Sequence, residues 1–380
     1  QTGHTVEGSE REESPTTELL AQKGVKISIG HDGCNIPADT ELVIYSDAVH
    51  TDNPERMWAQ EMGLVEMSYF EALGIVSKQM RTIAVAGTHG KTTTTGMLAK
   101  VLRDAEMRPT AIIGSIVRDF ESNFLAGRPD LFVVEACEYR DHLLRLSPEI
   151  LVITNIELDH TDYFPTLEAL QETFRIAAEK VPAQGYIITD PSAPTIAAVL
   201  KNVSAQVIDY TLVEVPDLTQ IGEFNRMNAR AAKAAALAAF PDLSESVIDG
   251  SLVAFKGAWR RFEYRGKTPL GAEVYDDYAH HPTAILKTIE AARARFPGKR
   301  IVVAFHPHLY SRTKSLMYEF AEALATADSA IVAPIYAARE ALEPAVSNEI
   351  VAAAAREAGG RVIALDSFDE IRDRLLQEGD

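Results

Sequence analysis

The sequence predicts an α/β protein of three domains whose sheets are mostly parallel. Strand patterns alternate with helix patterns along most of the chain, which is typical of parallel sheets covered by helices. A β-branched run ends in a glycine-punctuated loop, and a helix pattern follows at once over residues 92–102. A chain of 380 residues is also long for a single core. We place the domains at 1–79, 80–258 and 259–380.

In the first domain, residues 3–9 have the pattern of a strand already under way, and no glycine-rich turn precedes them. This domain is therefore expected to lack its own first strand. Its other predicted elements are helices at 15–23 and 53–62 and strands at 25–29 and 41–45.

The second and third domains repeat the alternation of strands and helices. In the second domain, strands are predicted at 111–113, 131–134, 150–154 and 186–189, and an alanine-rich packing helix at 226–240. In the third, strands are predicted at 273–275, 300–305, 330–333 and 362–365. Ser367–Glu370 is predicted to form a capping box that opens the last helix. That helix is predicted to end at Gly379–Asp380, where a further strand would be expected.

The composition restricts the class of partner. There are 37 lysine and arginine residues against 55 aspartate and glutamate residues, a net charge of −18. This excess argues against a nucleic-acid or membrane surface, because both require a basic field. Cys34 and Cys137 lack metal-type spacing and are interpreted as reduced thiols of a cytoplasmic protein. No apolar run is long enough to span a bilayer, and the polar, acidic start is not a signal peptide.

The loop at 87–93 is predicted to bind phosphate. Gly87 and Gly90 allow the backbone to approach a phosphate closely, and the following helix adds N–H donors and the positive end of its dipole. Lys91 can then reach the terminal phosphates, and the Thr92 hydroxyl can hold Mg²⁺. The alternative is a glycine turn between a strand and a helix with an exposed lysine.

Polar residues follow the next strands, where open α/β sheets bind their ligands. Glu135 ends one strand and His160 follows another, so both are expected to converge on the terminal phosphate. A carboxylate there is the usual second anchor of a nucleotide-bound Mg²⁺. His160 is alternatively a surface histidine bonded to Asp159 or Asp162. Glu138 could equally form a salt bridge with Arg140, and Cys137 is interpreted as a small residue in a crowded strand end.

Two strand-end loops of the third domain carry four histidines: His280, His281, His306 and His308. Such a group could be taken for a zinc site. We favour an anion site, because Arg312 lies in the second loop and suits a carboxylate or a phosphate, bound bidentately. The alternative is a pair of polar loops with capping duties.

These motifs together resemble those of the Mur ligases of peptidoglycan synthesis. The resemblance rests on residues 87–92, 135–138, 154–160, 222–225, 277–282 and 307–313, and it covers nearly the whole chain. It implies a Rossmann-like N-terminal domain (incomplete here), a central P-loop ATPase domain and a C-terminal Rossmann-like domain. Within the family, the last two motifs are most similar to the branch that joins L-alanine to UDP-N-acetylmuramate. That reaction consumes ATP and passes through an acyl phosphate.

The resemblance also implies roles for single residues. ATP is expected on Gly87, Thr88, His89, Gly90, Lys91, Thr92, Thr93 and Asn225, the last at the adenine. Two Mg²⁺ ions, which Mn²⁺ could replace, are expected on Thr92, Glu135 and His160. Substrates are expected on Ser46, His50, Asn53, Glu138, Tyr278, His280 and Arg312, and the catalytic residues are expected to be Lys91, His280 and Arg312. A monomer or weak homodimer in the cytoplasm is expected, without nucleic acid or membrane.

Several family features are missing from this sequence. The glycine-rich diphosphate loop of the first domain and the final strand are absent, and we expect that the sequence omits parts of a longer chain. Leu309 stands where an arginine is usual, and residues 168–175 contain no lysine that could be carbamylated. Two alternatives remain open: a related Mur-type or folate-polyglutamate ligase with another acceptor, and a non-catalytic nucleotide-binding regulator.

Overall fold

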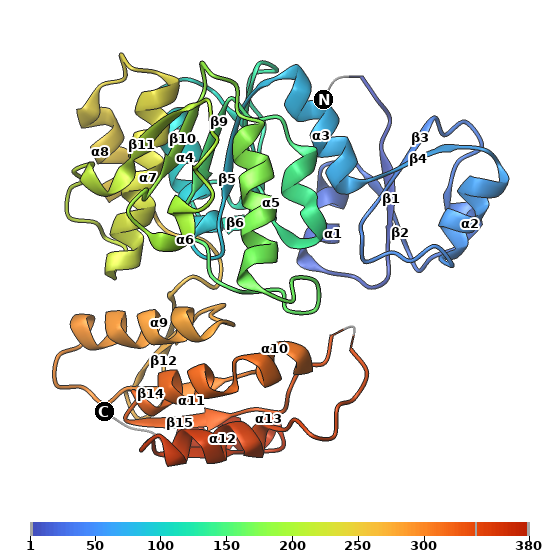
Figure 1. Ribbon diagram of the computed structural model, residues 1–380. Coiled ribbons are helices and arrows are strands. Elements are labelled where there is room, and N and C mark those ends of the chain that lie inside the picture. The colour runs from blue at the N-terminus through green and yellow to red at the C-terminus, as the bar shows by residue number, and fades with distance from the viewer. Residues whose placement is uncertain (1–2, 339, 378–380) are drawn as a thin grey trace. The chain divides into compact units, whose positions relative to one another are not determined.

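The computed structural model describes residues 3–338 and 340–377, and the chain divides into two compact units, Gln1–Val76 and Ser77–Asp380 (Figure 1). The second and third predicted domains therefore belong to one unit. The proposed boundaries at 79/80 and 258/259 remain predictions. None of the described helices is both long enough and apolar enough to cross a bilayer.

The described part of the first unit contains two separate pairs of parallel strands. β1 (Glu7–Glu10) pairs with β2 (Lys26–Ile29), and β3 (Leu42–Tyr45) pairs with β4 (Val65–Ser68). The helices are α1 (Pro15–Gln22), η1 (Gly33–Asn35), α2 (Pro54–Glu61) and α3 (Tyr69–Gln79), the last of which runs across the boundary between the units. The predicted helices and strands are confirmed to within a few residues. β4 and α3 were not predicted, because β4 is only four residues long and mixes polar with apolar side chains.

The second unit is built around a seven-stranded sheet in the order β11–β10–β9–β5–β8–β6–β7. The bounds are β5 (Arg81–Ala86), β6 (Thr110–Val117), β7 (Ser122–Leu125), β8 (Leu131–Glu135), β9 (Ile150–Ile153), β10 (Tyr186–Thr189) and β11 (Gln206–Asp209). All neighbours are parallel except the β6–β7 pair. β5 lies between β8 and β9, so the carboxyl ends of these three strands meet at one edge, where such sheets bind ligands.

Helices bury this sheet. They are α4 (Lys91–Asp104), η2 (Tyr139–Arg145), α5 (Leu167–Glu179), α6 (Pro194–Ala197), η3 (Tyr210–Leu212), α7 (Glu223–Ala239) and α8 (Glu245–Val253). Ile83 and Val85 of β5 pack with residues of α4, α7 and α8 in one core cluster. Every residue of β5 from Thr82 to Ala86 is buried, as expected for a parallel strand covered on both faces. The alanine-rich pattern is confirmed as a packing helix, because the small side chains of α7 let it lie close to α4.

The C-terminal part of the second unit carries a hairpin and a three-stranded parallel sheet, β14–β15–β16. Its elements are β12 (Glu263–Lys267), β13 (Glu273–Asp276), α9 (Pro282–Arg295), β14 (Val302–Phe305), α10 (Tyr310–Ser315), α11 (Met317–Ala325), β15 (Ser329–Val332), α12 (Asn348–Glu357), β16 (Val362–Ala364) and α13 (Phe368–Leu376). α11 and α12 pack on the sheet and on each other (Figure 1).

The predicted capping box of the last helix is only half formed. The Ser367 hydroxyl accepts a hydrogen bond from the Glu370 N–H, as a cap should, but the Glu370 carboxylate accepts from Asp366 instead of Ser367. The predicted end of this helix at Gly379–Asp380 lies outside the described residues.

Candidate active site

A cavity of about 1400 Å³ lies at the carboxyl ends of the central strands of the second unit. It gathers most of the residues that the sequence singled out, from both the central and the C-terminal part of this unit. The predicted site residues that line it are Thr88, His89, Gly90, Lys91, Thr92, Thr93, Glu135, His160, Asn225, Tyr278, His280 and Arg312. Residues up to 224 positions apart in the sequence therefore face one space.

The phosphate loop connects β5 to α4, so the predicted order of strand, loop and helix is confirmed. Gly87 has φ +125° and Gly90, which caps α4, has φ +86°. A Cβ atom would lie 2.1 Å from the Thr154 hydroxyl at the first position and 2.3 Å from the Asn228 side-chain oxygen at the second. Both the backbone conformation and the space therefore require glycine.

Part of the loop backbone is held by the segment after β9. The Thr88 N–H donates to the Asn155 carbonyl at 3.0 Å, and the His89 N–H donates to the Asn155 side-chain oxygen at 2.9 Å. The N–H groups of Thr88 and His89 are therefore already paired within the protein. The first turn of α4, from Lys91 to Thr93, still offers N–H groups without intrahelical partners.

The Lys91 side chain is not exposed, and its ammonium group is held by Glu138. Its ammonium lies 3.0 and 2.9 Å from the two Glu138 carboxylate oxygens and also donates to the carbonyls of Gly87 and Thr88. Burial disfavours the charged ammonium, but the Glu138 carboxylate outweighs this and raises the pKa of Lys91. Glu138 itself is only 1% exposed. The alternative of a Glu138–Arg140 salt bridge was wrong, because the buried carboxylate pairs with the nearer cation.

The predicted magnesium ligands Thr92 and Glu135 lie side by side. The Thr92 hydroxyl donates to Glu135 at 2.9 Å, and the other Glu135 oxygen accepts from the Gly114 N–H at 2.6 Å. A hydroxyl and a carboxylate supply the oxygen ligands that Mg²⁺ prefers, so this pair fits the ion.

His160 faces Glu138, whose carboxylate lies 3.7 Å from its Nε2. Its ring also packs on Tyr139 at 4.9 Å between centroids, while its side chain is still 23% exposed. The His160 backbone N–H donates to Asp159 at 2.6 Å, as in the alternative of a surface histidine, and the role of His160 as a metal ligand stays a prediction. Burial lowers the pKa of His160 in spite of the nearby carboxylates, which keeps the imidazole neutral at pH 7. A neutral imidazole can ligate a metal, but its nearest carboxylate is Glu138 and not Glu135.

Arg312 binds a carboxylate of the protein itself. Its Nε and Nη2 atoms both lie 2.8 Å from Asp159 Oδ1, and the two residues are 4% and 3% exposed. Asp159 also faces the His280 imidazole at 3.5 Å. The expectation that this edge of the guanidinium would clamp a substrate bidentately was wrong, because a buried carboxylate requires its own cation. The Nη1 side of the guanidinium, which does not contact Asp159, lies 3.4 Å from His308 Nδ1 and 3.5 Å from the His308 carbonyl.

Asn225 lines the cavity, but both ends of its amide already have partners. The amide nitrogen donates to the Ile221 carbonyl at 2.7 Å, and the oxygen accepts from Asn228 at 3.4 Å. Its assignment to the adenine stays a prediction. Of the substrate residues in the first unit, Asn53 caps α2 and Ser46 accepts from the Ala48 N–H. Their roles, and that of His50, also stay predictions.

The structure adds three residues that the sequence did not single out. Arg261 lies 3.2 Å from the Thr92 hydroxyl and 5.6 Å from the Tyr278 ring. Asp277 accepts from the N–H groups of Phe262 and Ala279, which shapes the loop that carries Tyr278. Asp159 was considered only as a partner of His160. Arg261 follows another arginine before a short strand, so no local pattern marks it.

The four histidines of the two C-terminal loops do not converge. His306 packs against Phe368 at 5.1 Å, His308 against Tyr336 at 5.3 Å, and His280 points to Asp159. Leu309, where an arginine was expected, is 2% exposed and has φ +73°.

Comparison with known proteins extends over the whole chain. Models of the Mur ligase family match as its catalytic domain at residues 1–81, its middle domain at 85–221 and its glutamate ligase domain at 260–380. UDP-N-acetylmuramate–L-alanine ligases are similar: that of Caldicellulosiruptor saccharolyticus is 36% identical over 100% of this chain and 89% of its own length. That of Rubrobacter xylanophilus is 38% identical over 94% and 85%.

Solved structures agree. The UDP-N-acetylmuramate–alanine ligase of Thermotoga maritima has a TM-score of 0.77 at 25% identity and covers 99% of this chain and 87% of its own. A murein peptide ligase of Psychrobacter arcticus has a TM-score of 0.70 at 25% identity, with 98% and 88% covered. With its fold, its phosphate loop and the match along its full length, the chain belongs to the Mur ligase family.

Proposed function

We propose that this chain joins L-alanine to UDP-N-acetylmuramate in an ATP-dependent reaction. The observation that carries the proposal is the cavity, where the phosphate loop and Glu135 share one space with Tyr278, His280 and Arg312 of the C-terminal part. A ligase that activates a carboxylate with ATP needs such a space, because it must bring three reactants together and keep water from hydrolysing the activated carboxylate. The relatives named for this reaction are similar over nearly the whole chain.

The reaction proceeds in two steps. A carboxylate oxygen of the sugar nucleotide attacks the γ-phosphorus of ATP, the bond to the bridging oxygen breaks, and an acyl phosphate and ADP form. The amine of L-alanine then attacks the acyl carbon, a tetrahedral intermediate collapses, the amine loses a proton, and phosphate leaves. Both steps move negative charge onto phosphoryl or carbonyl oxygens, so fixed positive groups lower the barrier.

The residues of the central part hold the nucleotide. The first-turn N–H groups of α4 and the Lys91 ammonium face the phosphates, and Lys91 shares its charge between Glu138 and the incoming γ-phosphate. Thr92 and Glu135 would hold one Mg²⁺ ion and His160 would be a ligand of a second, and Mn²⁺ is expected to substitute. Bound magnesium neutralises charge on the phosphoryl oxygens. Arg261, next to Thr92, is placed to contact the same oxygens.

The C-terminal residues hold the acceptor. Tyr278 and His280 line the same cavity as the phosphate loop, and His280 faces Asp159. The Arg312 Nη1 side adds a fixed positive charge for the alanine carboxylate. Ser46, His50 and Asn53 remain our assignment for the uridine diphosphate, and a monomer or weak homodimer in the cytoplasm remains the expectation.

A phosphate-release assay tests the proposal. With ATP, Mg²⁺ and UDP-N-acetylmuramate present, we expect release that depends strongly on L-alanine and is weak with glycine, L-serine or D-glutamate. The tripeptide L-alanyl-γ-D-glutamyl-meso-diaminopimelate is the control acceptor for the murein peptide ligase reaction. Preference for that tripeptide or for another amino acid would overturn the assignment of L-alanine as the acceptor. Absence of release with every acceptor, together with retained nucleotide binding, would indicate a non-catalytic regulator.

A further inference from the structure

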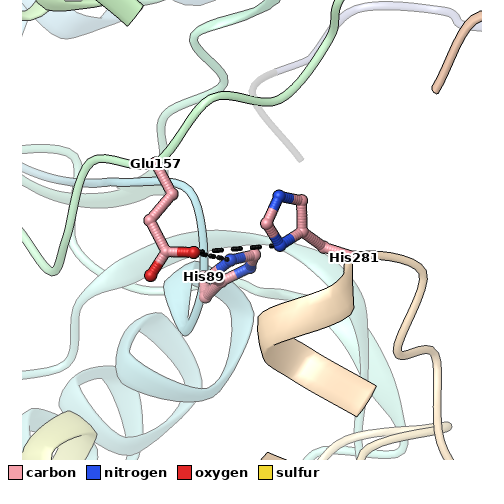
Figure 2. Close-up of side chains that lie close together, drawn as sticks. All are labelled: His89, Glu157 and His281. Carbon is pink, nitrogen blue, oxygen red and sulfur yellow. Dashed lines mark hydrogen bonds and ion pairs between the residues drawn. The ribbon is translucent and has the colours of Figure 1, made fainter. Parts of the chain in front are cut away.

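Three side chains beside the cavity form a compact group that the ligase reaction does not use as a unit. His89 comes from the phosphate loop, Glu157 from the segment after β9, and His281 from the residue before α9, and Figure 2 shows the carboxylate facing both imidazoles. We call these residues the His–Glu–His cluster. One ligand atom from each lies within 4.8 Å of the other two. The Glu157 Oε2 atom is 3.3 Å from His89 Nε2 and 3.8 Å from His281 Nδ1.

The hydrogen bonds around His281 fix where its proton lies. Its Nε2 is 3.1 Å from the Leu158 carbonyl, which can only accept, so this nitrogen carries the hydrogen. The Nδ1 atom of the neutral ring therefore carries the lone pair, and it lies 3.8 Å from the Glu157 Oε2 atom. Two acceptors that face each other repel, unless a cation lies between them. The Thr283 N–H reaches Nδ1 only at 3.4 Å, a long contact that a ligand would replace at little cost.

Glu157 is held in place by a further contact. The Thr283 hydroxyl donates to Glu157 Oε2 at 2.6 Å, and such hydrogen bonds to a carboxylate are what orient metal ligands in proteins. Burial raises the pKa of Glu157, but hydrogen bonds from His89 and Thr283 outweigh it and lower that pKa to about 2. Burial lowers the pKa of His281 to about 4. Both groups therefore have the deprotonated form that a metal requires at neutral pH.

The donor types and spacing suit one class of ion. Zinc takes nitrogen and oxygen ligands at about 2.0–2.2 Å in a tetrahedron, which places ligand atoms about 3.3 Å apart. Two of the three separations, 3.3 and 3.8 Å, are already close to that value. Two imidazoles and one carboxylate favour zinc or a similar transition ion over Mg²⁺, which prefers oxygen. Three protein ligands also leave a fourth position for water.

We propose that the His–Glu–His cluster binds one Zn²⁺-type divalent cation, at a site separate from the magnesium ligands Thr92, Glu135 and His160. Because its ligands come from the phosphate loop and from the start of α9, the bound ion links the central part of the second unit to the C-terminal part. The inference rests on these three side chains alone and does not depend on the acceptor assigned above.

Metal titration of the whole chain tests this site directly. Protein freed of metal with a chelator is titrated with Co²⁺ in the absence of ATP and Mg²⁺, and then with Zn²⁺ in competition. We expect one ion per chain, visible absorption bands of four-coordinate Co²⁺, and loss of these bands when zinc is added. Zinc is also expected to raise the thermal unfolding temperature.

The variants His281→Ala and Glu157→Gln should each weaken zinc binding at least tenfold, since even outer-shell partners change affinity by about 10–100-fold. Glu157→Gln keeps the size of the side chain and an acceptor for Thr283, so it covers the case in which His281→Ala does not fold. His306→Ala, which removes a histidine outside the cluster, and Glu135→Gln, which removes a magnesium ligand, should keep the affinity of the wild type. No cobalt bands in the wild type, or zinc binding that survives both cluster variants, would overturn the proposal.

Discussion

Replacing Asp159 with asparagine is expected to destabilise the second unit strongly, because it leaves the Arg312 guanidinium buried without its counter-charge. The wild-type pair is joined by two contacts of 2.8 Å, and the side chains are 5% and 4% exposed. Removing one partner of a buried ion pair costs about 3–5 kcal/mol, whereas an exposed pair contributes about 0–1 kcal/mol. Asparagine keeps one oxygen acceptor, so we expect the lower end, about 3 kcal/mol, or a factor of roughly 150 in the unfolding equilibrium.

The measurement is the free energy of unfolding from urea titration, followed by far-UV circular dichroism. Asp162→Asn is the matched control, because it makes the same chemical change three residues away at an exposed side chain. The double variant Asp159→Asn with Arg312→Gln has no buried charge at this place. The decrease in its unfolding free energy should therefore be clearly smaller than the sum of the decreases in the two single variants. A loss below about 1 kcal/mol for Asp159→Asn, or simple additivity in the double variant, would refute the reasoning.

The same pair predicts a pH dependence with a definite sign. Burial raises the pKa of Asp159, but the contacts with His280 and Arg312 outweigh it and hold that pKa well below its usual range. A carboxyl whose pKa is lower in the folded state stabilises the fold fully above its unfolded pKa, about 3.9, and loses this contribution as the pH falls toward the folded value. The difference in unfolding free energy between wild type and Asp159→Asn should therefore be constant above about pH 5 and shrink below pH 4.

Three further predictions concern the phosphate loop and its surroundings. Gly90→Ala should abolish nucleotide binding in a titration with a fluorescent ATP analogue, because the new Cβ would lie 2.3 Å from the Asn228 side-chain oxygen. The control is Gly250→Ala in α8, where a new Cβ has nothing within 4 Å, and it should bind the analogue as the wild type does. Lys91→Ala should reduce the rate of phosphate release by about 10²–10³-fold, because it removes one fixed positive charge at the phosphoryl group being transferred. Lys314→Ala, which changes an exposed lysine, should leave this rate unchanged. Equal rates for Lys91→Ala and the wild type would contradict the role of Lys91. Burial raises the pKa of the Cys137 thiol to about 11, so a disulfide reagent at pH 8 should label the exposed Cys34 first. Mass spectrometry of the digested protein measures the order of labelling. Faster labelling of Cys137 would contradict the raised pKa of its thiol.

Much of the fold could be predicted because its signals are local. Runs rich in β-branched residues, such as 82–86, form buried strands. The glycines Gly87 and Gly90, which have positive φ, restrict the conformation of the loop after this strand. The strands that escaped prediction are β4, β7 and β11, of four residues each, and β12, of five. The helix α3 was not predicted either. β7 and β11 lie at the two edges of the central sheet, where a strand is fixed by one neighbour and its own pattern is weak.

The sequence alone determined which residue types stand at strand ends, and hence that a phosphate loop, carboxylates and histidines would face one edge of the sheet. The tertiary structure decided which of them pair: Lys91 with Glu138, Arg312 with Asp159 at a separation of 153 residues, and His89 with Glu157 beside His281. The physical reason is that a buried charge takes the nearest opposite charge in space. That distance depends on strand order and on how the C-terminal part contacts the loops at the carboxyl ends of the central strands, and no local pattern in the chain encodes it.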